Sequence, residues 1–468
     1  MKRIFNSQTP KNTGKEVKVC GWAQTLRSHG KILFIDLRDM TGLLQMVFIP
    51  QQESAYKIAK TIRPEWVIEV SGQIVERPIK MANPKVETGR VELAAKEIKI
   101  LSEAKTLPFG IEGNGYEISE GKRMQYRYLD LRRQRMKKNL ETRHKTCQFI
   151  REWLQKEGFV EVETPLLTKS TPEGARDFIV PSRIDPGKFY ALPQSPQQYK
   201  QLLQVAGIER YFQIARCFRD EDPRGDRQPE FTQLDMEMSF MEEQEILELI
   251  ERLYIELVRK LFPEKKIQKI PFPRMPYSEV MEKYKSDKPD LRKNKSDPDE
   301  LAFAFVVDFP MFEWKKEEDR WDAVHHPFTR PKTENIEEIK KNPQKILAHQ
   351  YDFVLNGFEI GGGSLRTYRP EMLEAVFEVM GHKKTAIKEK FGHLLAAFEY
   401  GVPPHGGIAP GIDRFLAIMM NEPNIREVIA FPKTGDNRDL MMGSPSEVEK
   451  GQLNELAIKI VKPKKKKK

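Results

Sequence analysis

The chain has 468 residues, more than one hydrophobic core usually serves, so we expect two or three domains. Hydrophobic residues make up 39% and charged residues 32%, which is typical of a soluble globular protein, and no apolar run approaches the length of a membrane span. The first residues lack the apolar core of a secretion signal, and the three cysteines have no paired metal-ligand spacing. These features favour a cytoplasmic protein without membrane association.

The net charge of +10 is concentrated at one end of the chain. Six lysines, Lys462 and Lys464 to Lys468, lie in a basic tail over residues 456–468, and the rest of the chain carries about +4. Such a tail is typical of a solvated, disordered extension, which is the interpretation that composition favours. The alternative is that it helps to hold RNA phosphates through non-specific contacts.

Residues 1–105 predict a small five-stranded barrel. Apolar and polar positions alternate in short runs, and residues 51–62 predict a short helix between strands, which is the OB-fold pattern. A barrel of this kind, taken alone, is compatible with binding a peptide, a sugar or nothing. The predicted strands contain residues 17–22, 32–37, 43–48, 67–70 and 91–93.

A second domain is expected over residues 126–455, after a linker at 106–125 that is rich in glycine and polar residues. It opens with a helix over residues 136–157, predicted from an apolar stripe, and Gly158 is well placed to end that helix. Strands and helices follow to about Pro432. The predicted fold class is therefore α+β with more than one domain.

The most informative segment places two arginines, several acidic residues and an aromatic side chain on one predicted strand–loop–strand hairpin. Arginine forks bind phosphate oxygens bidentately and stay charged, while Phe231 offers a face on which a flat base can stack. The hairpin therefore predicts a site for an anionic, planar ligand such as ATP. Its residues are Phe218-Arg219-Asp220-Glu221, Arg227-Gln228-Pro229-Glu230-Phe231 and Asp235.

This hairpin resembles motif 2 of the class II aminoacyl-tRNA synthetases, and two further segments resemble motifs 1 and 3 in the order of that family. A lone FRDE is more often solvated charge, but three ordered matches make that reading improbable. The resemblance implies a catalytic domain with an antiparallel sheet flanked by helices, a homodimer formed through motif 1, and an anticodon-binding barrel. The two segments are Gly158-Phe159-Val160-Glu161-Val162-Glu163-Thr164-Pro165 and Gly407-Ile408-Ala409-Pro410-Gly411-Ile412-Asp413-Arg414.

Within this family, Lys200 and Arg366 favour aspartate as the amino acid. A charged group in a partly dehydrated pocket requires an opposite charge, because an unpaired buried charge costs several kcal/mol. Similarity to the aspartate enzymes assigns both cations to the substrate β-carboxylate. The alternatives are an asparagine enzyme, whose neutral substrate gives no reason for both cations, and a non-catalytic RNA-binding paralogue, against which intact Arg219, Glu359 and Arg414 argue.

The same resemblance implies further contacts to the amino acid. Glu173 lies in a loop that resembles a lid over the substrate, and His325 and His326 match a histidine pair near the substrate carboxylate. Zinc at this pair is disfavoured, because no third ligand stands nearby and adjacent side chains of an extended segment point in opposite directions. The predicted aspartate-binding residues are Glu173, Ser195, Gln197, Lys200, Arg219, Asp235, His325, His326 and Arg366.

ATP and Mg²⁺ are the expected co-substrate and cofactor. Asp352 and Glu359 form an oxygen-only pair that suits Mg²⁺ held jointly with phosphates; the alternative is that they are ordinary strand-end acids. The sequence contains no GxxxxGK[ST] loop and no HIGH or KMSKS pair, so P-loop and class I chemistry are not supported. The predicted catalytic residues are Arg219, Arg414 and Glu359, and the predicted ATP-binding residues are Arg219, Asp220, Glu221, Gln228, Phe231, Glu359, Gly411, Ile412, Asp413 and Arg414.

The chain departs from the bacterial aspartate pattern between motifs 2 and 3. A domain of more than a hundred residues usually interrupts the catalytic core there, whereas only a short lysine-rich stretch, residues 283–300, is present here. We therefore expect the insertion to be missing or reduced. Contacts of such a domain to the tRNA acceptor arm would be missing with it.

The resemblance also implies anticodon contacts on the barrel. Phe34 matches an aromatic that stacks on an anticodon base, and Gln45 is placed to hydrogen-bond another base, although an aromatic at alternate strand spacing is more often part of a core. His29 stands where enzymes restricted to tRNA-Asp commonly have leucine. A histidine there resembles the enzymes that also charge tRNA-Asn, so the partner is tRNA-Asp, with tRNA-Asn as a second hypothesis; the alternative is a solvated loop histidine.

Overall fold

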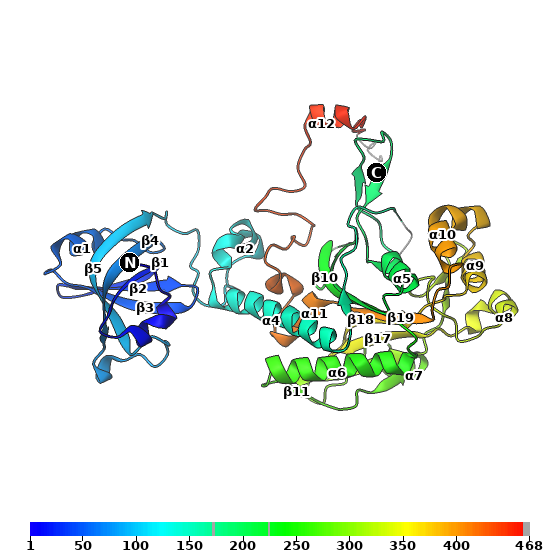
Figure 1. The fold of residues 1–468 in the computed structure, drawn as a ribbon, viewed down its shortest axis with the longest axis horizontal. Helices are drawn as coiled ribbons and strands as arrows, with labels where there is room; N and C mark the ends of the chain where they lie inside the picture. Colours follow the sequence, from blue (N-terminus) through cyan, green and yellow to red (C-terminus); the bar gives the residue numbers. More distant parts are fainter. Residues whose placement is uncertain (171–173, 223–224, 462–468) are drawn as a thin grey trace. The chain divides into compact units, whose positions relative to one another are not determined.

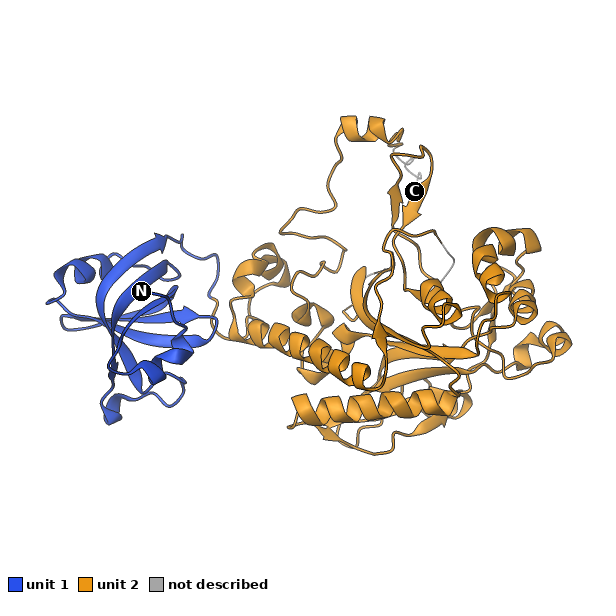
Figure 2. Cartoon of the chain, in the orientation of Figure 1, with its two compact units in different colours: residues 1–110 blue, residues 111–468 orange. Residues whose placement is uncertain are grey.

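The computed structural model describes residues 1–170, 174–222 and 225–461, and it divides into two compact units, residues 1–110 and 111–468 (Figure 2). Glu173 and the run of lysines from Lys462 lie outside the described residues. In the part of the chain that is described, no helix has the length and apolar character needed to cross a membrane.

The first unit is a closed barrel with the strand order β1-β2-β3-β5-β4, as the sequence predicts (Figure 1). Alternate residues fill its interior, including Ile35, Leu37, Leu44 and Met46, so the residues between them face outward. The strands are β1 (Glu16–His29), β2 (Ile32–Asp39), β3 (Gly42–Phe48), β4 (Val67–Glu76) and β5 (Val91–Ser102), accompanied by α1 (Glu53–Ala59) and the 3₁₀ helices η1 (Asn6–Asn12) and η2 (Ile79–Met81).

The second unit is built on an eight-stranded sheet with the order β12-β14-β17-β18-β19-β10-β9-β6. Its central neighbours are antiparallel, as predicted, while the edge pairs β12–β14 and β6–β9 are parallel. In chain order the strands are β6 (Val160–Glu161), β9 (Arg210–Phe218), β10 (Glu230–Ser239), β12 (Arg274–Pro276), β14 (Phe303–Val307), β17 (Gln350–Leu355), β18 (Phe358–Leu365) and β19 (His405–Pro410).

Helices α4 (Gln134–Lys156) and α6 (Glu243–Leu261) share one hydrophobic core with the sheet (Figure 1). Leu234, Met236 and Met238 of β10 point into this core. Because side chains alternate along a strand, Asp235 and Glu237 lie on the opposite face of β10, where the cavity described below is found.

A second apolar cluster joins helices α8 to α10 beside α5. The remaining elements are small. They are α2 (Glu120–Gln125), α3 (Arg127–Asp130), β7 (Ile179–Pro181), β8 (Phe189–Ala191), α5 (Gln197–Val205), β11 (Lys266–Ile267), α7 (Tyr277–Tyr284), β13 (Glu300–Leu301), β15 (Phe312–Lys315), β16 (Arg320–Ala323), α8 (Ile336–Lys341), η3 (Pro343–Lys345), α9 (Pro370–Val379), α10 (Lys384–Phe398), α11 (Ile412–Met419), η4 (Ile425–Val428) and α12 (Lys450–Glu455).

The segment predicted as a linker differs from that expectation in its second half. Residues 120–125 form α2, and Arg123 of this helix pairs with both carboxylate oxygens of Glu427 at 3.0 and 2.9 Å. The Arg123 and Glu427 side chains are buried, so this part of the chain is packed into the second unit. The polar composition of this segment does not predict such packing, because an ion pair between residues about 300 positions apart leaves no local pattern in the sequence.

The short stretch at 283–300 is an ordered connection from α7 to β13. Arg292 pairs with both carboxylate oxygens of Asp290 at 3.0 and 2.8 Å. The Glu300 carboxylate accepts hydrogen bonds from the backbone N–H groups of Lys293 and Asn294. The connection therefore satisfies its own polar groups without an inserted domain.

Candidate active site

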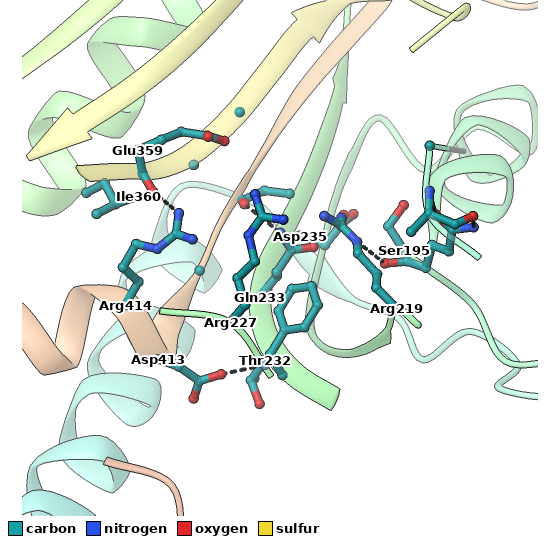
Figure 3. A pocket seen from close by; sticks show the side chains of 18 of the residues that line it. Ser195, Arg219, Arg227, Thr232, Gln233, Asp235, Glu359, Ile360, Asp413 and Arg414 are labelled. Carbon is teal, nitrogen blue, oxygen red and sulfur yellow. Dashed lines mark hydrogen bonds between the residues drawn. The ribbon is translucent and has the colours of Figure 1, made fainter. Parts of the chain in front are cut away.

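A cavity of about 380 Å³ opens on the face of β10 that carries Asp235 (Figure 3). Its walls come from β10, β18, β19, α5, the connection between β9 and β10, the start of α11 and the segment after β16, so segments far apart in the sequence meet here. The predicted site residues that line it are Ser195, Gln197, Lys200, Arg219, Glu221, Gln228, Phe231, Asp235, His325, His326, Glu359, Arg366, Gly411, Asp413 and Arg414.

One end of the cavity carries a buried network of charges. Lys200 Nζ lies 3.1 Å from Asp235 Oδ2 and 3.2 Å from Glu237 Oε2. Arg366 donates from Nε to Glu237 Oε1 at 2.8 Å and from Nη2 to Oε2 at 3.1 Å. Because each side chain is almost fully buried, these pairs fix the position of both cations.

Glu237 is the anion that holds this network together, and the sequence reasoning missed it. Burial alone would raise the pKa of Glu237, but the charges of Arg366 and Lys200 lower it to about 2. Burial raises the pKa of Asp235, and Lys200 opposes that effect. The available signal was the alternation along β10, which puts Glu237 on the same face as Asp235.

Two polar atoms at this end have no hydrogen-bond partner among the described residues. They are Asp235 Oδ1 and Gln197 Nε2, both buried. A buried polar atom left unpaired costs about 1–3 kcal/mol, so the arrangement is suited to a polar ligand that would pair with them. Asp235 Oδ1 can accept a hydrogen bond from an ammonium group.

His326 is a neutral acceptor toward the arginine. Arg366 Nη1 lies 2.7 Å from His326 Nε2, and a guanidinium only donates, so Nε2 accepts and the ring proton is on Nδ1. Burial and then the charge of Arg366 lower the pKa of His326 well below its ordinary value. Burial, reinforced by Arg366 and Arg219, lowers the pKa of His325 to about 4. Both rings are neutral at pH 7.

The other end of the cavity has the features of a nucleotide site. The Arg219 guanidinium lies 5.1 Å from the centre of the Phe231 ring, and Arg414 enters from the first turn of α11 (Figure 3). Arg414 donates to the backbone oxygen of Glu359 and lies 3.3 Å from Asp226 Oδ2, while its buried Nε has no hydrogen-bond partner in the described part of the chain. An aromatic ring between two arginines suits a base attached to phosphates.

The acidic pair predicted to hold Mg²⁺ lies on the adjacent strands β17 and β18. Asp352 is buried, and its pKa is raised well above the ordinary value by burial and then by the charge of Glu359. A cation beside both carboxylates would offset the repulsion between them and the cost of burying the Asp352 charge. Glu359 lines the cavity and Asp352 does not, and the described residues contain no group of three or more His, Cys, Asp or Glu arranged around a metal. Since Mg²⁺ usually keeps several waters and phosphate oxygens, two carboxylates fit it.

Three of the predicted ATP contacts have other partners in the structure. The side chain of Ile412 packs in the hydrophobic core, away from the cavity. Gln228 Nε2 donates to the backbone oxygen of Lys433 at 3.0 Å, and Gln228 Oε1 accepts from the backbone N–H of Lys433 at 2.7 Å. Asp220 lies outside the cavity wall, 3.6 Å from Arg176. A place in the motif does not specify the direction of a side chain, because Asp220 and Gln228 lie in the connection between β9 and β10 and Ile412 lies on a helix, where contacts made after folding decide the direction.

The glycines before Ser364 belong to strand β18 rather than to a flexible turn. A methyl group on Gly363 would lie 2.4 Å from the backbone oxygen of Gly407 and from the Tyr351 ring, and one on Gly362 would lie 3.0 Å from His325 Cε1. Glycine therefore lets neighbouring strands and His325 approach the chain that leads into Arg366.

The predicted anticodon residues lie on the outer surface of the barrel. Phe34 alternates with the buried Ile35, so it is not part of the barrel core. Gln45 donates to Glu92 Oε2 at 2.7 Å and accepts from Arg27 at 3.3 Å. His29 is the exposed last residue of β1. The outer face of β1 to β3 therefore carries the polar and aromatic groups that the prediction requires.

A barrel in one unit and an arginine-lined cavity on an antiparallel sheet in the other define the class of the tRNA synthetases. Residues 119–435 match the family described as tRNA synthetases class II (D, K and N), and residues 17–101 match the OB-fold nucleic acid binding domain. The chain belongs to the class II tRNA synthetases of the D, K and N group.

Curated relatives are similar over nearly the whole chain. The Aspartate–tRNA(Asp/Asn) ligase of Dehalococcoides mccartyi (strain CBDB1) is 41% identical, covering 97% of this chain and 98% of that protein. The enzyme of the same name from Dictyoglomus turgidum is 42% identical, covering 98% of each. The first alignment runs over 586 positions, so more than a hundred positions have no counterpart in these 468 residues, in agreement with the predicted loss of an insertion.

Solved structures share the fold. The asparaginyl-tRNA synthetase of Pyrococcus horikoshii complexed with asparaginyl-adenylate superposes with a TM-score of 0.74 at 22% identity, covering 93% of this chain and 98% of that chain. The aspartyl-tRNA synthetase of Entamoeba histolytica gives 0.71 at 21% identity, covering 92% and 91%. At these identities the likeness establishes the fold and not the amino acid.

Proposed function

We propose that this protein ligates L-aspartate to tRNA in two steps through aspartyl-adenylate, with ATP as the second substrate. The observation that carries the proposal is the pair of buried cations, Lys200 and Arg366, next to Asp235 Oδ1, for which the described residues supply no hydrogen-bond partner. The cations suit the β-carboxylate of aspartate and the Asp235 oxygen suits its ammonium group. The names of the curated relatives support the same amino acid.

Charge balance favours aspartate over asparagine. Lys200 and Arg366 bring two positive charges to this end of the cavity, Asp235 and Glu237 bring two negative charges, and Arg219 adds a third positive charge from the nucleotide end. A β-carboxylate would offset the remaining positive charge, whereas the amide of asparagine would leave it buried and uncompensated. Discrimination by a buried charge of this kind is worth several kcal/mol.

The chemistry requires no nucleophile from the protein. The aspartate α-carboxylate attacks the α-phosphorus of ATP and pyrophosphate leaves; the terminal ribose hydroxyl of tRNA then takes the aspartyl group and AMP leaves. Arg219 would hold the α-phosphate as charge builds on it, Phe231 would stack on adenine, and Arg414 would hold the outer phosphates. Catalysis rests on positioning and charge neutralisation. Asp352 and Glu359 would hold Mg²⁺, which supplies further neutralisation of phosphate charge.

Charging of transcripts tests the ligase activity and its tRNA range together. We expect the purified protein to load labelled aspartate onto tRNA-Asp. Since the two tRNAs differ at the third anticodon letter, and His29 lies exposed at the end of β1, we expect wild type to charge tRNA-Asn as well and His29→Leu to lose most of that second activity. Lys31→Leu, an exposed neighbour, is the control. A wild type that ignores tRNA-Asn contradicts dual specificity but not the ligase.

The motif 1 segment is also expected to form a homodimer. Val160 is 51% exposed and Leu167 53%, although both are apolar and both lie in or just after the short strand β6. Exposed apolar side chains in an edge strand and in the segment that follows it favour burial against a second copy of the chain.

We therefore expect wild type to be a dimer and Val160→Asp to shift it toward monomer, as measured by light scattering after size exclusion. Val448→Asp is the matched control, because Val448 is 46% exposed but lies far along the chain from motif 1. A monomeric wild type, or an unchanged dimer in Val160→Asp, contradicts this assignment.

A further inference from the structure

An ion pair at the wall of the cavity joins helix α4, which leads into the motif 1 segment, to the motif 2 and motif 3 segments. Asp413, in the first turn of α11, is 3% exposed. One of its carboxylate oxygens accepts a hydrogen bond from the backbone N–H of Thr232 at 2.8 Å (Figure 3). The other is paired with Nη1 of Arg143 on α4. A helix, a strand and a second helix thus meet at one carboxylate.

The topology of the sheet explains why Thr232 needs this partner. Strand β19 pairs with β10 from Met236 to Ser239, and a single bridge between Gln233 and Gly411 continues this pairing. The chain then turns into α11 at Ile412, so no strand backbone follows on that side of Thr232. Thr232 is buried, and an amide without an acceptor there would cost about 1–3 kcal/mol. Asp413 supplies the acceptor that the missing strand would have given.

Arg143 compensates the buried charge of Asp413 and anchors it to α4. Its Nη1 also lies 3.4 Å from the backbone oxygen of Val428, and Asn139, one turn earlier on α4, donates to the backbone oxygen of Glu427 at 3.1 Å. A buried carboxylate without its cation is strongly destabilised, so removal of Arg143 would displace Asp413.

The neighbours of this pair in sequence are the groups proposed to hold ATP. Asp413 precedes Arg414, and Thr232 follows Phe231. A shift of Asp413 therefore changes the separation between the arginine for the outer phosphates and the ring for adenine. We infer that Arg143 is a positioning residue for the nucleotide end of the site, acting through Asp413; this inference rests on the proposed function.

The expected result is a selective loss of ATP binding. Arg143→Met should raise KM for ATP on the order of ten- to a hundredfold and lower kcat. A displacement of a binding group by about 1 Å reduces the efficiency of an enzyme by up to about this factor. KM for aspartate should stay within about twofold, because no described contact joins Arg143 to Lys200 or Arg366. Arg143→Lys, which restores the charge, should recover most of the ATP affinity. Lys145→Met, an exposed lysine on the same helix, is the matched control.

Pyrophosphate exchange with varied ATP and aspartate measures both KM values. Wild type is measured first: if it shows no aspartate-dependent exchange, the proposed function fails, whatever Arg143 does. With an active wild type, an unchanged KM for ATP in Arg143→Met, or equal rises for ATP and aspartate, overturns the inference. Should Arg143→Met not fold, Asp413→Asn replaces it, with Arg143→Lys as the conservative comparison. A loss of thermal stability without a change in KM for ATP in Asp413→Asn overturns the inference.

Discussion

Arg219→Ala and Arg414→Ala are each expected to abolish adenylate formation while the protein still folds and binds tRNA. Each guanidinium reaches the nucleotide end of the cavity, and neither belongs to the buried Lys200–Glu237–Arg366 network. Because preorganised charge is worth most where negative charge develops, the exchange rate should fall by roughly 10² or more. The measurement is aspartate-dependent pyrophosphate exchange.

Arg210→Ala is the matched control for these variants. Arg210 is the exposed first residue of β9, the same strand that leads to Arg219, and it does not line the cavity. Its exchange rate should equal that of wild type. Near-normal exchange in Arg219→Ala or Arg414→Ala would show that the nucleotide site lies elsewhere.

Lys200→Leu is expected to raise the aspartate requirement far more than the ATP requirement. The ammonium of Lys200 lies at the amino-acid end between Asp235 and Glu237, so its loss leaves these two buried carboxylates with Arg366 as their one cation at this end and removes the surplus of positive charge. A change of several kcal/mol corresponds to a rise in KM for aspartate of roughly 10² or more. KM for ATP should change little.

Steady-state exchange with each substrate varied separates the two effects. Lys188→Leu removes an exposed lysine outside the cavity and should leave both KM values unchanged. Thermal unfolding accompanies the assay, because Lys200 also compensates buried acids. Equal losses for aspartate and ATP would place Lys200 outside the side-chain pocket.

Much of the fold could be predicted from the sequence because local patterns specify it. Alternation placed the five barrel strands, and the apolar stripe with Gly158 at its end placed α4 to within two residues. The motif residues Arg219, Phe231 and Arg414 lie in one cavity as their order along the chain implied.

The partners of individual polar groups could not be predicted in this way. The Gln228 amide is satisfied by the backbone of Lys433, 205 residues away, and the Asp413 carboxylate by Arg143, 270 residues away. Glu237 could not be predicted as a site residue, because a glutamate on a strand usually lies at the surface. Only the fold brings Lys200 and Arg366 next to it. Motif residues thus locate a site, while long-range contacts decide which of them face the ligand.

The most direct test of the proposed function is pyrophosphate exchange by the wild-type protein with a single amino acid supplied at a time. We predict ATP formation from labelled pyrophosphate that depends on L-aspartate, with asparagine and lysine giving no more than background, because only a β-carboxylate offsets the positive charge held by Lys200 and Arg366. Exchange supported by asparagine instead of aspartate, or absent with every amino acid, would contradict it.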